Sequence, residues 1–272
     1  MHDPGYARLP PGWTAADNCL SDRVVLVTGA AGGLGRAGAL AVARAGATAV
    51  LLGRKVRPLE KIYDEVAALG YRQPAIYPLD LEGASPRDYE DMAAGIEQEF
   101  GRLDGVVNAA AHFSGLQPAA SIEPMDWLRT LHVNLSAPFL MLQACLPLMT
   151  RAADASVVFV LEDLARVGRA HWGAYGVAKH GLAGLVSILQ QETEAGPVHV
   201  HALLPPPLRT ALRRTAYFGE NSITLPKPDA VADALIYLLS ADGAAARGKV
   251  LDARGEGRGQ RAEGEQSARD AG

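Results

Sequence analysis

Residues 24–35 read Val-Val-Leu-Val-Thr-Gly-Ala-Ala-Gly-Gly-Leu-Gly, an apolar run that passes directly into a glycine-rich turn. The run at 24–27 predicts a fully buried strand. Residues 34–45 are nearly all good helix formers, and Gly46 supplies a stop. Glycines let backbone approach a ligand, and the free N–H groups and dipole of a helix N-terminus favour negative charge. The stretch therefore predicts a dinucleotide site; the alternative is a turn that only reverses the chain.

The end of the second apolar strand predicts which dinucleotide binds. About twenty residues after the turn, where such folds place the residue that reads the adenine ribose, the strand at 48–52 ends in Gly53-Arg54-Lys55. An acidic residue there would accept hydrogen bonds from both ribose hydroxyls of NAD. Arg54 can instead hold a 2′-phosphate through two parallel hydrogen bonds, with Lys55 as a second charge. The position favours NADP(H); the alternative is that both cations only begin a solvated helix.

Composition limits the remaining function classes. The 272 residues are 49% hydrophobic and 21% charged with a net charge of −4, which is typical of one globular α/β core and not of a nucleic-acid binder. Residues 1–18 lack an apolar signal core, and no eighteen apolar residues follow one another, so we expect neither export nor membrane spanning. Cys19 and Cys145 match no metal spacing, and reduced thiols of a cytoplasmic protein are the simplest interpretation.

Strands alternate with helices along the chain. Such alternation implies right-handed crossovers and a parallel sheet with helices on both faces, so we predict one doubly wound α/β domain over residues 22–254. Residues 1–21 are expected to be a loose extension, and residues 255–272 a disordered tail. The other expected strands are 75–79, 104–107, 156–161, 198–204 and 249–251, and the other expected helices are 58–69, 86–100, 125–149, 172–194 and 229–240.

Tyr175 and Lys179 form the clearest catalytic candidate. In the run Tyr175-Gly-Val-Ala-Lys179 they lie at i and i+4, one above the other on a single helical face. A nearby ammonium stabilises a phenolate and draws the tyrosine pKa from about 10 towards neutrality, which lets the phenol give or take a proton. Alone, such a pair is usually accidental; behind a predicted dinucleotide site it indicates proton transfer.

Together these motifs resemble the short-chain dehydrogenase/reductase family, whose fold is of the Rossmann type. The resemblance covers about residues 20–253, and the run Gly-Arg-Ala-His-Trp-Gly-Ala-Tyr that ends at Tyr175 is most similar to the bacterial YciK-like branch. The matching motifs are the turn Thr28-Gly29-x-x-x-Gly33-x-Gly35, the adenine contact Asp80, the segment Asn108-Ala-Ala-Ala, the helix asparagine Asn134, the pair Tyr175 and Lys179, and Thr210 after the sixth strand.

The resemblance implies an oxidoreductase that uses NADP(H). In the family, the tyrosine protonates a carbonyl oxygen while hydride arrives from nicotinamide C4. The lysine lowers the tyrosine pKa and holds the nicotinamide ribose, and the asparagine anchors a water that leads to the lysine. The cofactor-binding residues that the resemblance implies are Gly29, Ala31, Gly32, Gly33, Leu34, Gly35, Arg54, Asp80, Leu81, Asn108, Lys179 and Thr210.

Glu162 departs from the family pattern. The family places a serine thirteen residues before the tyrosine, where it polarises the carbonyl, and Glu162 occupies that position here. Ser156, the nearest upstream serine, lies roughly 20 Å away at ~3.3 Å per residue and cannot substitute. An ionised Glu162 would face the oxygen on which negative charge develops. A Glu162 kept protonated by its apolar strand could donate the missing hydrogen bond.

The sequence thus predicts an NADP(H)-dependent oxidoreductase that acts on a small carbonyl or alcohol, with Tyr175, Lys179, Asn134 and Glu162 as candidate catalytic residues. The alternative is a catalytically impaired nucleotide-binding protein of the same fold with a sensing or scaffold role. The effect of Glu162 on turnover distinguishes the oxidoreductase from this alternative.

Other partners follow from weaker signals. His199 and His201 alternate onto one face of a strand, but no third ligand is near in sequence, so no metal is expected. We also expect no nucleic-acid or membrane partner. Apolar residues on more than one face of the helices at 136–149 and 172–188 predict a homodimer or homotetramer.

Overall fold

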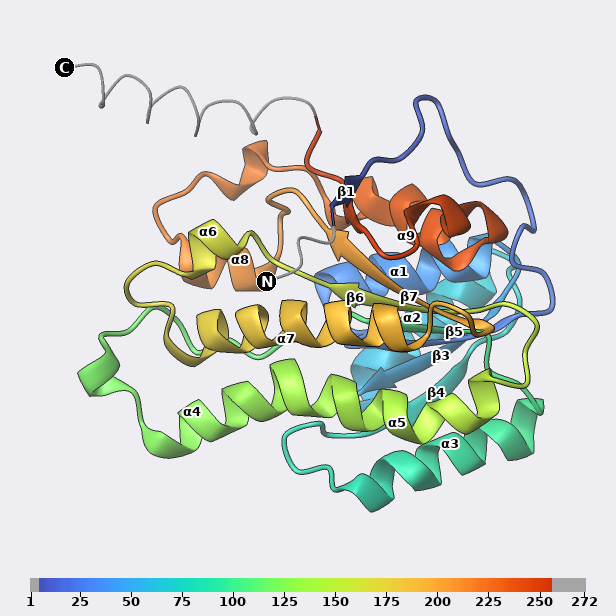
Figure 1. Cartoon of the computed structure of the whole chain (residues 1–272), viewed down its shortest axis with the longest axis horizontal. Coiled ribbons are helices and arrows are strands. Elements are labelled where there is room, and N and C mark those ends of the chain that lie inside the picture. The colour runs from blue at the N-terminus through green and yellow to red at the C-terminus, as the bar shows by residue number, and fades with distance from the viewer. Residues whose placement is uncertain (1–4, 256–272) are drawn as a thin grey trace.

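The computed structural model describes residues 5–255, which form one eight-stranded parallel sheet (Figure 1). The strands are β1 (Tyr6–Ala7), β2 (Val24–Thr28), β3 (Thr48–Gly53), β4 (Ala75–Pro78), β5 (Gly105–Asn108), β6 (Ala155–Val160), β7 (Val198–Leu204) and β8 (Val250–Asp252). Their order is β1-β8-β7-β6-β5-β2-β3-β4, and every neighbouring pair is parallel. The predicted doubly wound α/β fold is confirmed.

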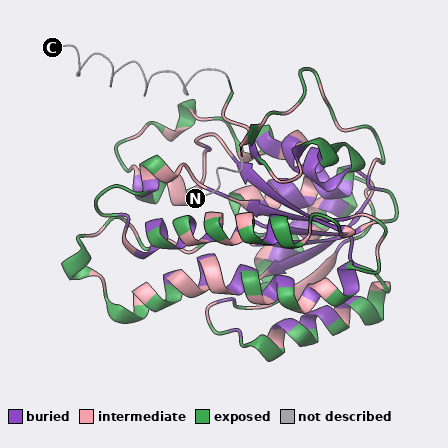
Figure 2. Cartoon of the chain, in the orientation of Figure 1, coloured by how far each residue is buried: buried purple, intermediate pink, exposed green. Residues whose placement is uncertain are grey.

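Helices cover both faces of the sheet and form two apolar cores with it. One face carries α1 (Gly33–Arg44), α2 (Val56–Ala68) and α9 (Ala232–Leu239). The other carries α3 (Pro86–Phe100), α5 (Ala137–Met149) and α7 (Gly173–Glu192). With both faces covered, the central strands are buried along their length, as Figure 2 shows. This is why apolar residues, valine above all, dominate these strands on both faces.

The strand order reverses between β2 and β5. From β2 the chain builds outwards through β3 and β4, and it then returns to β5 on the opposite side. In open α/β sheets, ligands bind beyond the carboxyl ends of the strands at such a reversal. The glycine turn follows β2 at this point, so the topology predicts a ligand site at this edge of the sheet.

The N-terminal extension is not loose throughout. Its Tyr6–Ala7 strand pairs with β8, where Tyr6 lies opposite Val250. The Trp13 indole N–H donates to Asp242 at 2.9 Å, and the Trp13 ring meets the Tyr237 ring edge-on with centroids 5.2 Å apart. The extension therefore closes one end of the sheet. The predicted disordered tail lies outside the described residues except for Gly255.

The predicted helix at 125–149 is continuous but irregular. It consists of α4 (Pro124–Leu131), the π-helical turn η2 (His132–Ser136) and α5. Within the described residues this is one helix long and apolar enough to cross a membrane by length and composition alone. It packs against α3 and α7 in the fold, as a core helix does. The π turn carries Asn134, one of the candidate catalytic residues.

Candidate active site

A cavity of about 510 Å³ opens beyond the carboxyl ends of the central strands. All but one of the cofactor-binding residues expected from the sequence line it; the exception is Gly35, which lies behind the turn. Tyr175, Lys179 and Glu162 line the same cavity, whereas Asn134 lies behind its wall. The fold thus brings the cofactor candidates and three of the four catalytic candidates together.

The glycine turn has no room for side chains. Gly29 has φ +63°, and a Cβ added there would lie 2.8 Å from the Ala110 Cα. A Cβ at Gly35 would lie 2.1 Å from the Gly29 carbonyl oxygen. No side chain caps α1 at Gly32, and its first turn holds no acidic residue. The residues present therefore fit a pyrophosphate, since backbone can approach it closely and the helix N-terminus is left to an anion.

Thr28 fixes this turn against the neighbouring strand. Its hydroxyl oxygen accepts hydrogen bonds from the backbone N–H groups of Ala109 at 3.1 Å and Ala110 at 3.0 Å. Both residues come directly after β5, so the two strand ends that flank the reversal are joined. These two hydrogen bonds hold the segment Asn108-Ala-Ala-Ala in place.

Glu82 organises the basic end of the cavity. Its carboxylate lies 2.8 Å from an Arg54 guanidinium nitrogen, 3.2 Å from Arg129 Nε and 3.6 Å from His112 Nδ1. Arg54 lines the cavity as predicted, and its side chain is 58% exposed. A 2′-phosphate at Arg54 would therefore compete with the Glu82 carboxylate for the same guanidinium.

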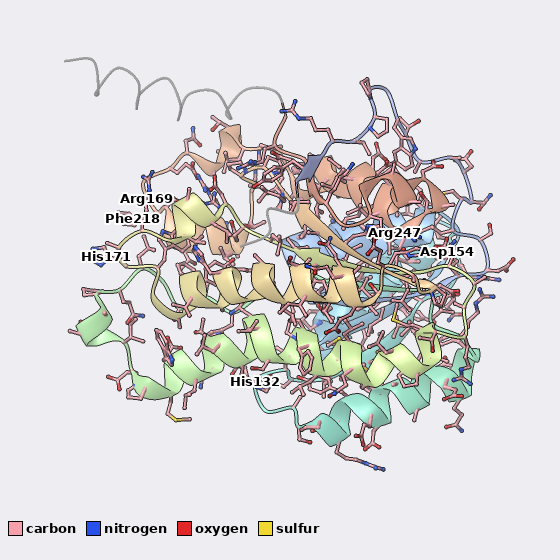
Figure 3. All side chains as sticks on the ribbon, viewed as in Figure 1. His132, Asp154, Arg169, His171, Phe218 and Arg247 are labelled. Carbon is pink, nitrogen blue, oxygen red and sulfur yellow. The ribbon has the colours of Figure 1, made fainter. Side chains whose placement is uncertain are left out.

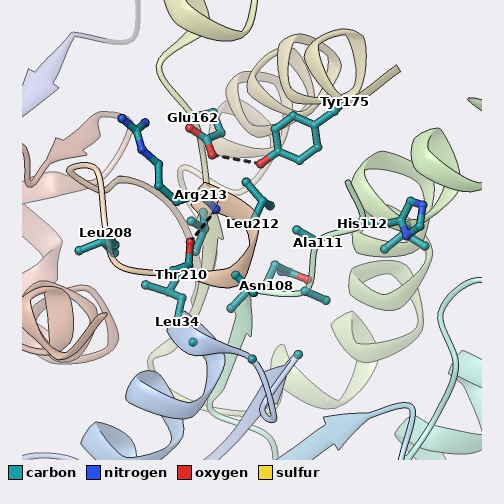
Figure 4. A pocket seen from close by; sticks show the side chains of 18 of the residues that line it. Leu34, Asn108, Ala111, His112, Glu162, Tyr175, Leu208, Thr210, Leu212 and Arg213 are labelled. Atoms are coloured by element: carbon teal, nitrogen blue, oxygen red, sulfur yellow. Dashed lines mark hydrogen bonds between the residues drawn. The ribbon is translucent and has the colours of Figure 1, made fainter. Parts of the chain in front are cut away.

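Glu162 contacts both Tyr175 and a cation. The Tyr175 hydroxyl, on a side chain that is 3% exposed, donates to Glu162 Oε1 at 3.0 Å (Figure 4). The other carboxylate oxygen, Oε2, pairs with Arg166. Arg166 follows in the short helix α6 (Leu164–Val167) and also lines the cavity. The two carboxylate oxygens of Glu162 are thus occupied by different partners, a phenol on one and a guanidinium on the other.

The direction of the Tyr175 pKa shift in this arrangement is opposite to the one expected for a phenol beside a lysine. Burial, and then the charge and hydrogen bond of Glu162, raise the pKa of Tyr175 well above its ordinary value, while Arg166 acts in the opposite direction. The Lys179 ammonium lies 5.7 Å from the Tyr175 ring centroid and donates to the Val160 carbonyl at 3.0 Å. Burial lowers the pKa of Lys179, and Glu162 partly offsets this. The nearest charge to the phenol is negative.

Asn134 joins the π turn to the segment after β5. Its Nδ2 donates to the carbonyls of His112 and Thr130, both at 2.8 Å, and its Oδ1 accepts from the His112 N–H at 3.2 Å. The side chain is 1% exposed. It therefore positions the cavity wall, and the structure does not bring it into contact with the other three catalytic candidates.

Comparison with protein families identifies the chain. The family model for short chain dehydrogenases matches residues 23–220. The chain belongs to the short-chain dehydrogenase family. The resemblance drawn from the cofactor turn and the Tyr175–Lys179 pair is confirmed.

The chain is similar to an oxidoreductase and to two solved structures from bacteria. The uncharacterized oxidoreductase YciK of Escherichia coli K12 is 33% identical over 235 residues, which cover 86% of this chain and 93% of YciK. A short chain dehydrogenase structure from Pseudomonas syringae is 37% identical with a TM-score of 0.83, over 88% of this chain and 98% of that one. A short chain dehydrogenase structure from E. coli CFT073, complexed with NADPH, is 34% identical with a TM-score of 0.83. The match covers 88% of this chain and 99% of that one.

Sequence reasoning missed two residues that line the cavity of this short-chain dehydrogenase. Arg213 and Tyr217 line the cavity, in and just after α8 (Ala211–Ala216). Arg213 makes two hydrogen bonds of 2.7 Å to Glu220 and lies 3.8 Å from the Tyr217 ring centroid. Trp172 also lines the cavity, with its ring 5.9 Å from that of Tyr175. No sequence signal marked Arg213 and Tyr217, because the six residues of α8 are too few to show a helical period.

Proposed function

We propose that this chain is an NADP(H)-dependent oxidoreductase that transfers hydride between the nicotinamide and a polarised carbon–heteroatom bond, of which a carbonyl or alcohol is the ordinary example. The observation that carries the proposal is the glycine cradle at Gly29 and Gly35, which side chains cannot enter, next to a cavity that holds Tyr175 and Lys179. The NADPH complex of a relative at 34% identity supports the choice of nucleotide.

Different residues of the chain bind the parts of the cofactor and orient the substrate. When bound, NADPH supplies the hydride. Arg54, with Lys55 beside it in the cavity wall, binds the 2′-phosphate, and the turn at Gly29 to Gly33 holds the pyrophosphate. Lys179 lies beneath the phenol and holds the nicotinamide ribose. Tyr175 orients the reacting group and, with a carbonyl, supplies its proton.

Nucleotide preference should change in opposite directions in two variants. Arg54→Ala should weaken NADPH binding roughly tenfold, the range of one charge-assisted phosphate contact, and leave NADH binding nearly unchanged. Glu82→Gln should tighten NADPH binding several-fold, because it removes the carboxylate that competes for Arg54 at 2.8 Å. Fluorescence titration of both nucleotides measures this. Tighter binding of NADH than NADPH by the wild type, or equal losses for both in Arg54→Ala, would contradict the assignment.

Hydride transfer is tested in the same cuvette. A panel of carbonyl compounds and their carbon–nitrogen analogues is added to the protein with NADPH, and nicotinamide absorbance is followed. Oxidation of NADPH that depends on both the substrate and the protein would support the oxidoreductase. Tight NADPH binding with no turnover, in the wild type and in Glu162→Ser alike, would instead favour a nucleotide-binding protein without activity.

We also propose that the chain works in the cytoplasm as a homodimer or homotetramer. The support is an apolar groove between α4 and α7, which is lined by Ile122, Trp127 and Leu128 on one side and Val177 on the other. Leu128 is 56% and Val177 51% exposed in the single chain, and exposed apolar groups of this size favour association. Light scattering after size-exclusion chromatography should give two or four times the 28.6 kDa chain mass. A monomer at micromolar concentration would contradict it.

A further inference from the structure

The reacting end of the cavity holds the carboxylate of Glu162. Its Oε1 accepts the Tyr175 hydroxyl at 3.0 Å, and its Oε2 pairs with Arg166. Both Glu162 and Tyr175 line the cavity, so a group that reacts beside the Tyr175 hydroxyl also lies beside Oε1. The charge that the substrate carries there, and how that charge changes during hydride transfer, therefore decides whether Glu162 helps or hinders.

The reduction of a carbonyl is electrostatically unfavourable beside Glu162 and Tyr175. Hydride addition to a carbonyl builds negative charge on oxygen, which would lie against a carboxylate. The oxygen must then receive a proton, but the Tyr175 O–H is directed at Glu162. Burial and Glu162 also raise the pKa of Tyr175, which makes it a weaker proton donor. Charge, hydrogen-bond direction and acidity all disfavour carbonyl reduction.

We propose that the hydride acceptor is a cationic carbon–nitrogen double bond, an iminium ion, and that the reverse reaction oxidises the corresponding amine. This rests on the proposed hydride transfer and replaces only the carbonyl by its nitrogen analogue. Hydride from NADPH adds to the iminium carbon, the C=N π pair moves to nitrogen, and the positive charge is cancelled. The products are the amine and NADP⁺. No proton has to be delivered, so a tyrosine that is a weak acid is no handicap.

The cations near Glu162 contact other atoms, so the carboxylate oxygen Oε1 keeps its negative charge exposed to a substrate. Arg166 pairs with the far oxygen, Oε2. The Arg213 guanidinium is held by two hydrogen bonds to Glu220. The Lys179 ammonium donates to the Val160 carbonyl. In Figure 4, Glu162 and Tyr175 face each other across the dashed bond while the Arg213 side chain extends to the other side of Glu162.

Aromatic groups add to the match with a cation. Trp172 lines the cavity beside Tyr175, and Phe113 lies 5.1 Å from the Tyr175 ring centroid and 5.4 Å from that of Trp172. Cations are attracted to the faces of aromatic rings, most strongly to tryptophan. The apolar body of a cyclic or alkyl-substituted iminium ion would be accommodated by Trp172 and Tyr175, which line the cavity.

The test uses substrates whose charge is permanent. N-methylated cyclic iminium ions are compared with ketones of the same ring size, in five-membered, six-membered and benzo-fused rings, under NADPH and with the wild type, Glu162→Gln and Glu162→Ser. The wild type should prefer the iminium ion at each ring size that it accepts. In Glu162→Gln, which keeps the shape and removes the charge, the ratio of kcat/KM for iminium to ketone should fall roughly 100-fold, as for loss of one aligned electrostatic group.

Binding gives a readout without turnover. Isothermal titration with an N,N-dimethylated ring ammonium ion, with and without NADP⁺, should give tighter binding to the wild type than to Glu162→Gln. Preference of the wild type for ketones, or an unchanged substrate ratio in Glu162→Gln, overturns the iminium assignment and leaves the oxidoreductase standing. Failure of the wild type and of Glu162→Ser to oxidise NADPH with either class overturns the proposed function and this inference together.

Discussion

Acidification from pH 6.5 towards pH 3 should remove up to about 5 kcal/mol of folding free energy through His201 alone. Burial lowers the pKa of His201 to about 3, from 6.5 for an ordinary histidine. Between these values the unfolded chain binds a proton that the folded chain excludes, so the free energy of unfolding falls as the pH falls. The loss begins near pH 6.5 and is complete only near pH 3.

The surroundings of His201 explain why it stays neutral. It is 1% exposed on β7, and its Nδ1 has no hydrogen-bond partner among the described residues. After burial, the charges of His199 and Arg247 are the next causes that lower the pKa of His201, and Asp154 opposes them. Asp154 and Arg247 lie together at one end of the molecule, far from His171 at the other (Figure 3). Protonation would place a second cation beside Arg247.

Urea unfolding at pH 7.0 and pH 4.5 measures this effect, and comparison with variants separates it from the carboxylates that begin to titrate in the same interval. The wild type should lose roughly 2 to 3 kcal/mol more than His201→Gln over this interval. His201→Leu provides a second non-titrating variant should the buried amide be poorly accommodated. His180→Gln is the matched control, because His180 is exposed on α7, and it should follow the wild type. Equal losses in all the variants would show that His201 does not carry the acid sensitivity.

The sheet was predictable because its central strands are buried on both faces. β2, β5 and β6 are rich in valine and other apolar residues, and the helices between them show ordinary length and periodicity. The two-residue strand β1 has no such run, and it forms because β8 offers a free edge at the far end of the chain. Local pattern cannot report a partner that lies more than 240 residues away.

The cofactor half of the site was predictable for a similar reason. The glycine turn consists of consecutive residues, and Arg54 comes directly after the second strand of the dinucleotide site. The contacts that modify these residues were not predictable. Arg54 meets Glu82 only because β3 and β4 end side by side, with Gly53 opposite Pro78. The pKa of Tyr175 is raised first by burial and then by Glu162, and the burial of a side chain depends on contacts that consecutive residues do not show.

Gly35→Ala should abolish useful NADPH binding, with a loss of roughly 100-fold or more, and lower the free energy of unfolding by about 2 kcal/mol or more. A Cβ there would lie 2.1 Å from the Gly29 carbonyl oxygen and 2.5 Å from its carbonyl carbon. Both obstacles are backbone, so no rotamer change can relieve them. The turn must move, and the backbone groups aimed at the pyrophosphate move with it. NADPH titration and urea unfolding measure the two losses.

Gly184→Ala provides the matched control because it makes the same chemical change in another helix. Gly184 lies in α7, is exposed, and a Cβ there would meet nothing within 4 Å. Alanine in a helix is more favourable than glycine by about 1 kcal/mol, so this variant should be more stable and bind NADPH normally. Opposite signs in the two variants would trace the defect of Gly35→Ala to the turn. Unchanged NADPH binding in Gly35→Ala would mean that the dinucleotide does not lie on this turn.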